Sequence, residues 1–95
     1  MRFITTYVLE LEDNKYYVGM TCNLNLRLLE HFTGEYSAKW TSKYKPIRLQ
    51  EVHIGNIERV VTLKYMLKYG FKNVRGAGWC RIEMKNPPKA LATFI

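Results

Sequence analysis

The feature that most constrains this chain is a pair of strand-like segments separated by a few polar residues. Residues 2–11, RFITTYVLEL, are rich in β-branched and aromatic side chains, and residues 16–20, YYVGM, have the same character. The residues between them, EDNK, include Asp and Asn, which accept the backbone conformations of a turn. The sequence therefore predicts that the chain begins with an antiparallel hairpin.

A helix and a third strand are expected next. Residues 21–35 predict a helix that Thr21 or Asn23 caps and that Gly34 ends. Residues 47–54, IRLQEVHI, alternate between apolar and polar side chains as a half-buried strand does. The helix residues expected to face the core are Leu24, Leu28, Leu29 and Phe32.

The rest of the sequence predicts a second helix followed by a loop and a short C-terminal strand. Residues 55–70 form this helix, with Asn56 as its cap, and residues 71–78 form a loop. Residues 79–84 are a short final strand, after which two prolines close the ordered part. The core side of the second helix is assigned to Ile57, Val60, Val61 and Leu67. The fold class is thus α/β (α+β), in the order β-β-α-β-α: one domain over residues 1–95, with a small three-stranded, mainly antiparallel sheet flanked by helices.

The charge and composition of the chain limit the kinds of partner that it is expected to bind. The formal net charge of +7 on 95 residues favours an anionic partner, nucleic acid first, over a basic surface kept only for solubility. No apolar run approaches the roughly 18 residues of a membrane span. The first residues are interpreted as a strand rather than a signal peptide, and two cysteines do not make a disulfide framework, so an intracellular location is expected.

Several spaced motifs resemble the GIY-YIG nuclease family. TYV at residues 6–8 and YVG at residues 17–19 stand where that family has its two triplets, and Arg27 follows at the family's spacing. The run CNLNLR resembles the family's typical Asn-Leu…Arg run, and KYKPIRL and YMLKYGFKNVRG resemble its small viral and environmental members. The resemblance covers about residues 3–80. It implies a metal-dependent DNA endonuclease that hydrolyses phosphodiester bonds, recognises DNA structure more than sequence, and serves repair or recombination.

The resemblance also implies roles for four residues. Tyr7 or Tyr17 takes a proton from the attacking water, and Arg27 stabilises the charge that builds on phosphorus. A tyrosine base needs its pKa lowered from about 10, here by Arg27 and a metal. His31, one helical turn from Arg27, relays a proton or orients a tyrosine. Taken singly, the tyrosines are ordinary half-buried strand residues, and the Arg and His ordinary helix residues.

One face of the hairpin must carry both tyrosines. Because side chains alternate along a strand, a two-residue turn would pair Tyr7 with Tyr16. A three-residue turn at residues 12–14 places Tyr7 and Tyr17 together. We predict this turn, with Asn14 in the left-handed region.

The expected metal ligand is Glu58, holding Mg²⁺ or Mn²⁺ mainly through water. Counting back from MLKYG places the family's glutamate at Thr62 instead, where no carboxylate stands, and Glu58 lies one turn earlier on the same face. Met20 also replaces a lysine that often follows the second triplet. These departures leave open an inactive nucleic-acid-binding module of the same fold.

The predicted DNA-binding surface joins basic and aromatic side chains, which contact phosphates and stack on unpaired bases. Asn73 stands where related nucleases often carry a site asparagine. No segment predicts a base-reading module, so a protein partner or homodimer is expected to supply any sequence specificity. A basic protein that docks on an acidic partner is the third alternative. The residues assigned to this surface are Lys39, Trp40, Lys43, Lys45, Asn73 and Arg75.

Overall fold

The computed structural model describes residues 3–94, so Arg2, where the predicted first strand began, lies outside them. Short 3-10 turns at Glu12–Asn14 and Phe71–Asn73 follow β1 and α3. The elements in chain order are β1 (Thr5–Leu11), β2 (Lys15–Thr21), α1 (Leu24–Thr33), α2 (Lys39–Lys43), β3 (Pro46–Ile54), α3 (Glu58–Tyr69), β4 (Val74–Gly76) and α4 (Lys89–Ala92).

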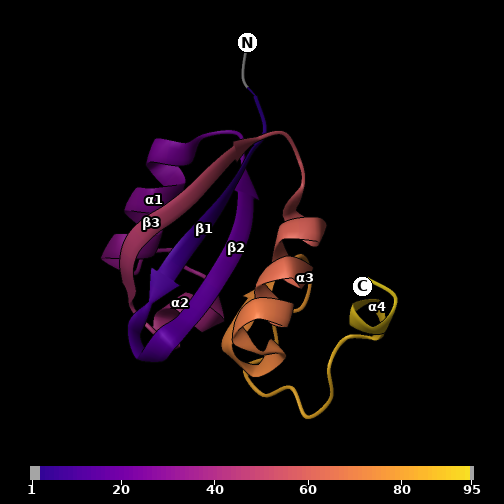
Figure 1. The fold of residues 1–95 in the computed structure, drawn as a ribbon. Helices are drawn as coiled ribbons and strands as arrows, with labels where there is room; N and C mark the ends of the chain where they lie inside the picture. Colours follow the sequence, from indigo (N-terminus) through magenta and orange to yellow (C-terminus); the bar gives the residue numbers. More distant parts are fainter. Residues whose placement is uncertain (1–2, 95) are drawn as a thin grey trace.

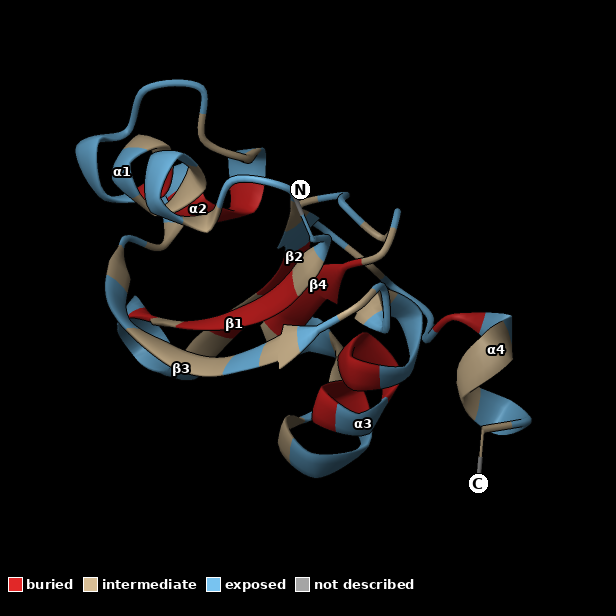
Figure 2. Cartoon of the chain, turned by 90° about the horizontal axis from the view of Figure 1, so that it is seen from above, coloured by how far each residue is buried: buried red, intermediate tan, exposed pale blue. Residues whose placement is uncertain are grey.

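The strands form a single mixed sheet in the order β3-β1-β2-β4. β1 is antiparallel to both β2 and β3, whereas β4 is parallel to β2. Helices α1 and α2 cover one face of this sheet and α3 covers the other, with α4 beside α3 (Figures 1 and 2). Within residues 3–94, no helix combines the length and apolar character needed to cross a membrane.

The fourth strand corrects the predicted three-stranded sheet. β4 lies in the segment predicted to be a loop, and its three residues are buried beside Tyr16, Tyr17 and Val18 of β2. Three residues next to two glycines carry too little strand pattern to be recognised, because the pairing partner is remote in sequence. The strand predicted at residues 79–84 is wrong: Trp79 forms an isolated bridge with Gly76, and the chain then continues as coil to α4.

The hairpin turn has the predicted length. Leu11 pairs with Lys15, which leaves the three residues 12–14 in the turn, and Asn14 is left-handed at φ 56°. The register then pairs Leu9 with Tyr17, so Tyr7 and Tyr17 point to the same face.

The helix ends are only partly as predicted. Asn23 caps α1 by accepting the Leu26 N–H at 3.2 Å. Asn56 does not cap α3. Instead, the Thr6 hydroxyl on β1 accepts the Ile57 N–H at 3.0 Å and donates to the Gly55 carbonyl at 2.7 Å, which ties the start of α3 to the sheet.

Both helices are rotated relative to the predicted core faces. In α1, Leu24 and Leu28 pack against the core as predicted, but Leu29 and Phe32 are exposed and His31 is buried instead. One inward position of α1 is therefore a polar residue, which a count of apolar side chains overlooks. In α3, Val61 is buried, whereas the predicted core residues Ile57, Val60 and Leu67 are exposed. The residues that replace them in the core are Thr62, Leu63, Tyr65 and Met66.

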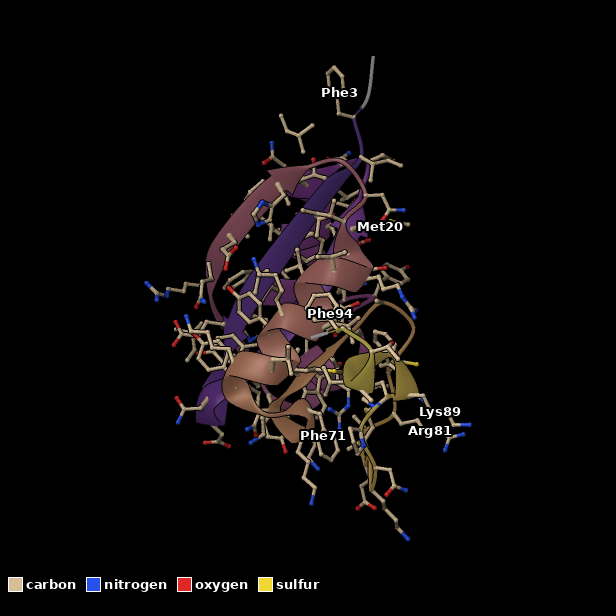
Figure 3. The ribbon with its side chains drawn as sticks, turned by 45° about the vertical axis from the view of Figure 1, so that its right-hand side comes forward. Phe3, Met20, Phe71, Arg81, Lys89 and Phe94 are labelled. Carbon is tan, nitrogen blue, oxygen red and sulfur yellow. The ribbon has the colours of Figure 1, made fainter. Side chains whose placement is uncertain are left out.

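Two hydrophobic clusters result, one on each face of the sheet. The α3 side holds Val8, Val18 and Val74 together with the aromatic rings of α3, and residues of the C-terminal segment, including Phe94, pack over it (Figure 3). The α1/α2 side is built around Tyr7 and Trp40. This second cluster also contains the polar side chains that concern function.

Candidate active site

A chain of hydrogen bonds runs through the α1/α2 side of the sheet. The Tyr7 hydroxyl lies 2.8 Å from His31 Nε2, and His31 Nδ1 lies 3.0 Å from the Thr41 hydroxyl. Thr41 donates its own proton to the Ala38 carbonyl at 3.1 Å, so it accepts from Nδ1–H of His31. That assignment leaves Nε2 of His31 without a proton, ready to accept the Tyr7 O–H. The chain therefore has one direction, from Tyr7 to Ala38.

Gly19 makes room for this arrangement. It is the cross-strand partner of Tyr7, and a Cβ at this position would lie 2.5 Å from the Tyr7 hydroxyl oxygen. Because Tyr7 is buried, a side chain here would displace its ring from His31. The close approach of Tyr7, the tyrosine of the TYV triplet, thus explains why the YVG triplet has a glycine.

Tyr17 and Arg27 lie beside this chain. The Tyr17 ring centroid is 6.4 Å from that of Tyr7 and 5.2 Å from that of His31. Arg27 Nη1 donates to Glu30 at 2.9 Å and to the Tyr36 carbonyl at 2.7 Å, which fixes the guanidinium. The fold therefore brings together the four residues to which the sequence assigned chemistry.

The pKa values of the two tyrosines bear on one expectation. Burial raises the pKa of Tyr7, and Tyr17 adds to this effect, whereas Arg27 acts in the opposite direction. Burial likewise raises the pKa of Tyr17 against the effect of Arg27. Arg27 therefore acts in the predicted direction, but alone it does not outweigh burial: both phenols keep their protons at neutral pH.

His31 has the opposite shift. Burial, reinforced by the positive charge of Arg27, lowers the pKa of His31 to about 4. The imidazole is consequently neutral at pH 7, which matches its role as acceptor of the Tyr7 hydroxyl proton.

Glu58 lies at the start of α3 and lines a cleft that Tyr17 also lines. The cleft has a volume of about 520 Å³. Burial raises the pKa of Glu58, partly offset by the backbone N–H of Ala77. Thr62, the alternative position, is fully buried, and its hydroxyl donates to the Glu58 carbonyl at 2.7 Å. Glu58, not Thr62, therefore faces the cleft.

The donor set at this cleft fits one kind of metal site. In the part of the chain that the structure describes, no three His, Cys, Asp or Glu side chains gather as a ligand cluster. A lone carboxylate suits Mg²⁺ or Mn²⁺ held mostly by water and by substrate phosphate, and does not suit an all-protein cage.

The predicted DNA-binding residues divide into two groups. Lys39, Lys43 and Lys45 are exposed on and after α2. Trp40 and Arg75 correct the prediction: they are 3% and 1% exposed, and the arginine lies over the indole ring at 4.2 Å. Both side chains are therefore almost wholly withdrawn from solvent. The sequence pattern of basic and aromatic residues does not distinguish surface from core.

Asn73 has a local role in the structure. Its side-chain N–H₂ donates to the Tyr69 carbonyl at 2.7 Å, at the C-terminal end of α3. It does not line the cleft that contains Tyr17 and Glu58.

Sequence reasoning missed the residues that support the site. Thr41, which anchors His31, is a threonine in a polar segment with no distinguishing signal. The cleft wall formed by residues 76–82 was also missed, because that segment was predicted to be loop and strand. The two glycines in it, Gly76 and Gly78, were the available signal, because glycine accepts the positive φ values that both have in the structure.

The hairpin, the helix that places Arg27 and His31 above it, and the acid at the start of α3 belong to one small α+β domain. In a comparison with known sequences, the family described as "GIY-YIG catalytic domain" matches residues 3–69. This chain belongs to the GIY-YIG family, which is a family of nucleases.

A curated relative extends the comparison. The chain is 42% identical over 62 residues to the UPF0213 protein of Syntrophus aciditrophicus (strain SB). The match covers 65% of this chain and 66% of that protein, just under two thirds of its length. No solved structure matches.

Proposed function

We propose that the chain is a metal-dependent DNA endonuclease that hydrolyses phosphodiester bonds and recognises DNA structure more than sequence. The observation that carries this proposal is the directed hydrogen-bond chain from Tyr7 through His31 to Thr41, next to Tyr17 and Arg27. A core built only for stability gains little from such a chain, because each buried polar group costs desolvation.

Tyr7 is the proton acceptor in this proposal. It need not become a phenolate first: as its oxygen takes a proton from the attacking water, its own proton passes along the hydrogen bond to Nε2 of neutral His31, which lies 2.8 Å from the Tyr7 oxygen. Thr41 keeps His31 in the tautomer that can accept. Tyr17, which lines the cleft, orients the water and the phosphodiester.

Arg27 stabilises the phosphorane. Its planar guanidinium carries a permanent charge next to both tyrosines, and the bonds to Glu30 and to the Tyr36 carbonyl hold it in place before substrate arrives. A group fixed in advance costs no reorganisation when charge builds on phosphorus.

Glu58 holds Mg²⁺ or Mn²⁺ in this proposal, and the metal supplies neutralisation of the leaving oxygen. The carboxylate is near enough to influence the pKa of both tyrosines. Exposed Lys39, Lys43 and Lys45 contact the DNA backbone, where a high net charge of +7 favours association.

The test is cleavage of labelled linear, flapped and branched DNA with and without Mg²⁺ or Mn²⁺. Wild type should cut only with metal, and Tyr17→Phe, Arg27→Ala and Glu58→Gln should each lose about 10²-fold or more in rate. Glu10→Gln, on β1 and paired with exposed Arg48, is the matched control and should cut normally. Equal cutting by all variants would contradict the site assignment.

The second candidate function is a binding module that retains the fold without the chemistry. The raised pKa values of both tyrosines favour it. The same experiment separates the two functions, because tight DNA binding with no cutting by wild type in any metal supports the binding module.

A further inference from the structure

The cleft that contains Tyr17 and Glu58 has two sides of different origin. One side comes from β2, α2 and the start of α3, all within the family match over residues 3–69. The other side comes from residues 76–82, including Ala77, Cys80 and Ile82, which lie beyond that match. The cleft is therefore incomplete without a segment that lies beyond the family match.

Arg75 holds this segment in place. It is 1% exposed, yet no carboxylate pairs with it in residues 3–94; its guanidinium donates to four backbone carbonyls instead. Two of these, Arg81 at 2.6 Å and Ile82 at 3.0 Å, belong to the segment. The other two acceptors are the carbonyls of Phe71 at 2.9 Å and Val74 at 2.8 Å. Only a planar group with several fixed donors can bridge these carbonyls together.

The backbone that follows Arg75 also helps to hold residues 76–82 in place. A Cβ on Gly76 would lie 2.3 Å from the Val18 carbonyl oxygen, so β4 approaches β2 more closely than any side chain allows. Ala77 and Gly78 then have φ values of 53° and 89°, which turn the chain sharply toward the cleft. Trp40 closes the arrangement by stacking on Arg75 and by donating its ring N–H to the Tyr16 carbonyl at 2.9 Å.

We propose that residues 76–82 form the second wall of the substrate cleft and that Arg75 is the positioning residue for this wall. The proposal rests on the proposed function, since the occupant of the cleft is a DNA strand. Charge complementarity identifies this occupant: exposed Lys39 lines one side and exposed Arg81 the other, so the sugar-phosphate backbone passes between two cations. Figure 3 shows the Arg81 side chain pointing outward from the C-terminal segment.

Cys80 offers a direct probe, because it is exposed and lines the cleft. In a Cys22→Ser background, the rate at which N-ethylmaleimide alkylates Cys80 is measured in EDTA, with and without a saturating branched DNA oligonucleotide. DNA should slow the reaction at least 5-fold. Cys22, also exposed but outside the cleft, is the matched control in a Cys80→Ser background and should react at an unchanged rate.

Binding of the same oligonucleotide is measured separately by fluorescence anisotropy, which makes the outcomes distinguishable. Binding without protection of Cys80, or with equal protection of Cys22, overturns the second wall and leaves the proposed function standing. No binding at all overturns the proposed function, and the inference with it.

Arg75→Lys tests the positioning role, because lysine keeps the positive charge but lacks the planar guanidinium with its several fixed N–H donors. Amide hydrogen exchange of residues 78–82 should accelerate at least 10-fold, whereas exchange of Val8 in the central strand should not. The KM for DNA should rise at least 5-fold with kcat within 3-fold. Arg48→Lys, at an arginine of β3, the sheet edge opposite β4, that pairs with Glu10, is the control and should change neither. Equal acceleration at Val8, or an unchanged KM, would reduce Arg75 to a stability residue.

Discussion

Tyr16 and Tyr17 are neighbours in the chain, yet they lie on opposite faces of the sheet in surroundings of different kinds. Tyr16 is 7% exposed and stacks on Tyr69, with ring centroids 4.3 Å apart, in a cluster of aromatic and apolar side chains. Tyr17 lies between a neutral histidine and a cleft that contains a carboxylate.

The difference shows that residue type alone does not make a reactive site. Both faces carry buried phenols with a raised pKa, so burial does not distinguish them. What distinguishes the α1/α2 face is a neutral imidazole behind one phenol and a fixed arginine beside both, whereas the Tyr65 phenol on the other face meets a carboxylate. Substitutions that alter these features should have effects that decrease in size from Tyr7 to Thr41.

The largest effect is expected from removing the Tyr7 hydroxyl. Tyr7→Phe leaves His31 Nε2 without its partner and takes away the proton acceptor, so the cleavage rate should fall about 10²- to 10⁴-fold. Tyr65→Phe, on the other face, loses hydrogen bonds to Gln50 and Glu51 and should cut at the normal rate. Single-turnover cleavage assays of the two variants compare the faces directly, and similar losses in both would refute the distinction.

The next effect is a pH dependence of stability caused by His31. Its pKa is about 4 in the folded protein and about 6.5 when unfolded, so the unfolded state binds the proton more readily. The free energy of unfolding should therefore fall as the pH drops from 6.5 toward 4, by roughly 3 kcal/mol in total. Urea unfolding of wild type and of His31→Gln over this range measures the contribution as the difference between the two slopes. Parallel curves would mean that His31 is not buried as a neutral base.

A smaller effect is expected at Gly19. Gly19→Ala places a methyl group against the Tyr7 ring and should cost about 1–3 kcal/mol of stability. Cleavage should fall as well, because the Tyr7–His31 bond lengthens. Met20→Ala, at the exposed next residue, is the control for a change in the same strand. Thermal unfolding and a cleavage assay of both variants check this, and a fully active Gly19→Ala would show that the close contact is dispensable.

The smallest effect is expected at Thr41. Thr41→Val preserves shape but removes the acceptor of the His31 Nδ1–H, at a cost of about 1–3 kcal/mol for the buried group left unpaired. The tautomer is then no longer fixed, so activity should fall about 10-fold or less, by analogy with the loss of other histidine-orienting groups. Thr33→Val, at an exposed threonine of α1, should change neither quantity. Nitrogen chemical shifts of the His31 ring report the tautomer independently of activity.

Much of the fold could be predicted because its rules are local. The hairpin, its three-residue turn and the Asn23 cap follow from neighbouring residues, and the structure has all three. β4 and the core faces of α1 and α3 could not be predicted, because remote contacts decide them. His31 and Thr62 face inward at positions where an apolar pattern expects leucine or valine.

The candidate site, like the fold, has a part that could be predicted from local sequence and a part that could not. Spacing along the hairpin and α1 brought Tyr7, Tyr17, Arg27 and His31 together, since a turn and a helix have fixed geometry. Arg75 was assigned to DNA, but the fold uses it to hold carbonyls inside the protein. A sequence shows that an arginine is present, and only the tertiary structure shows which groups it meets.

The most direct test of the account uses the two adjacent tyrosines. Cleavage of labelled branched DNA in Mg²⁺ should be reduced at least 10²-fold in Tyr17→Phe and should stay within about 2-fold of wild type in Tyr16→Phe. A Tyr17→Phe variant that cuts as well as Tyr16→Phe would contradict the claim that the α1/α2 face of the sheet is an active site.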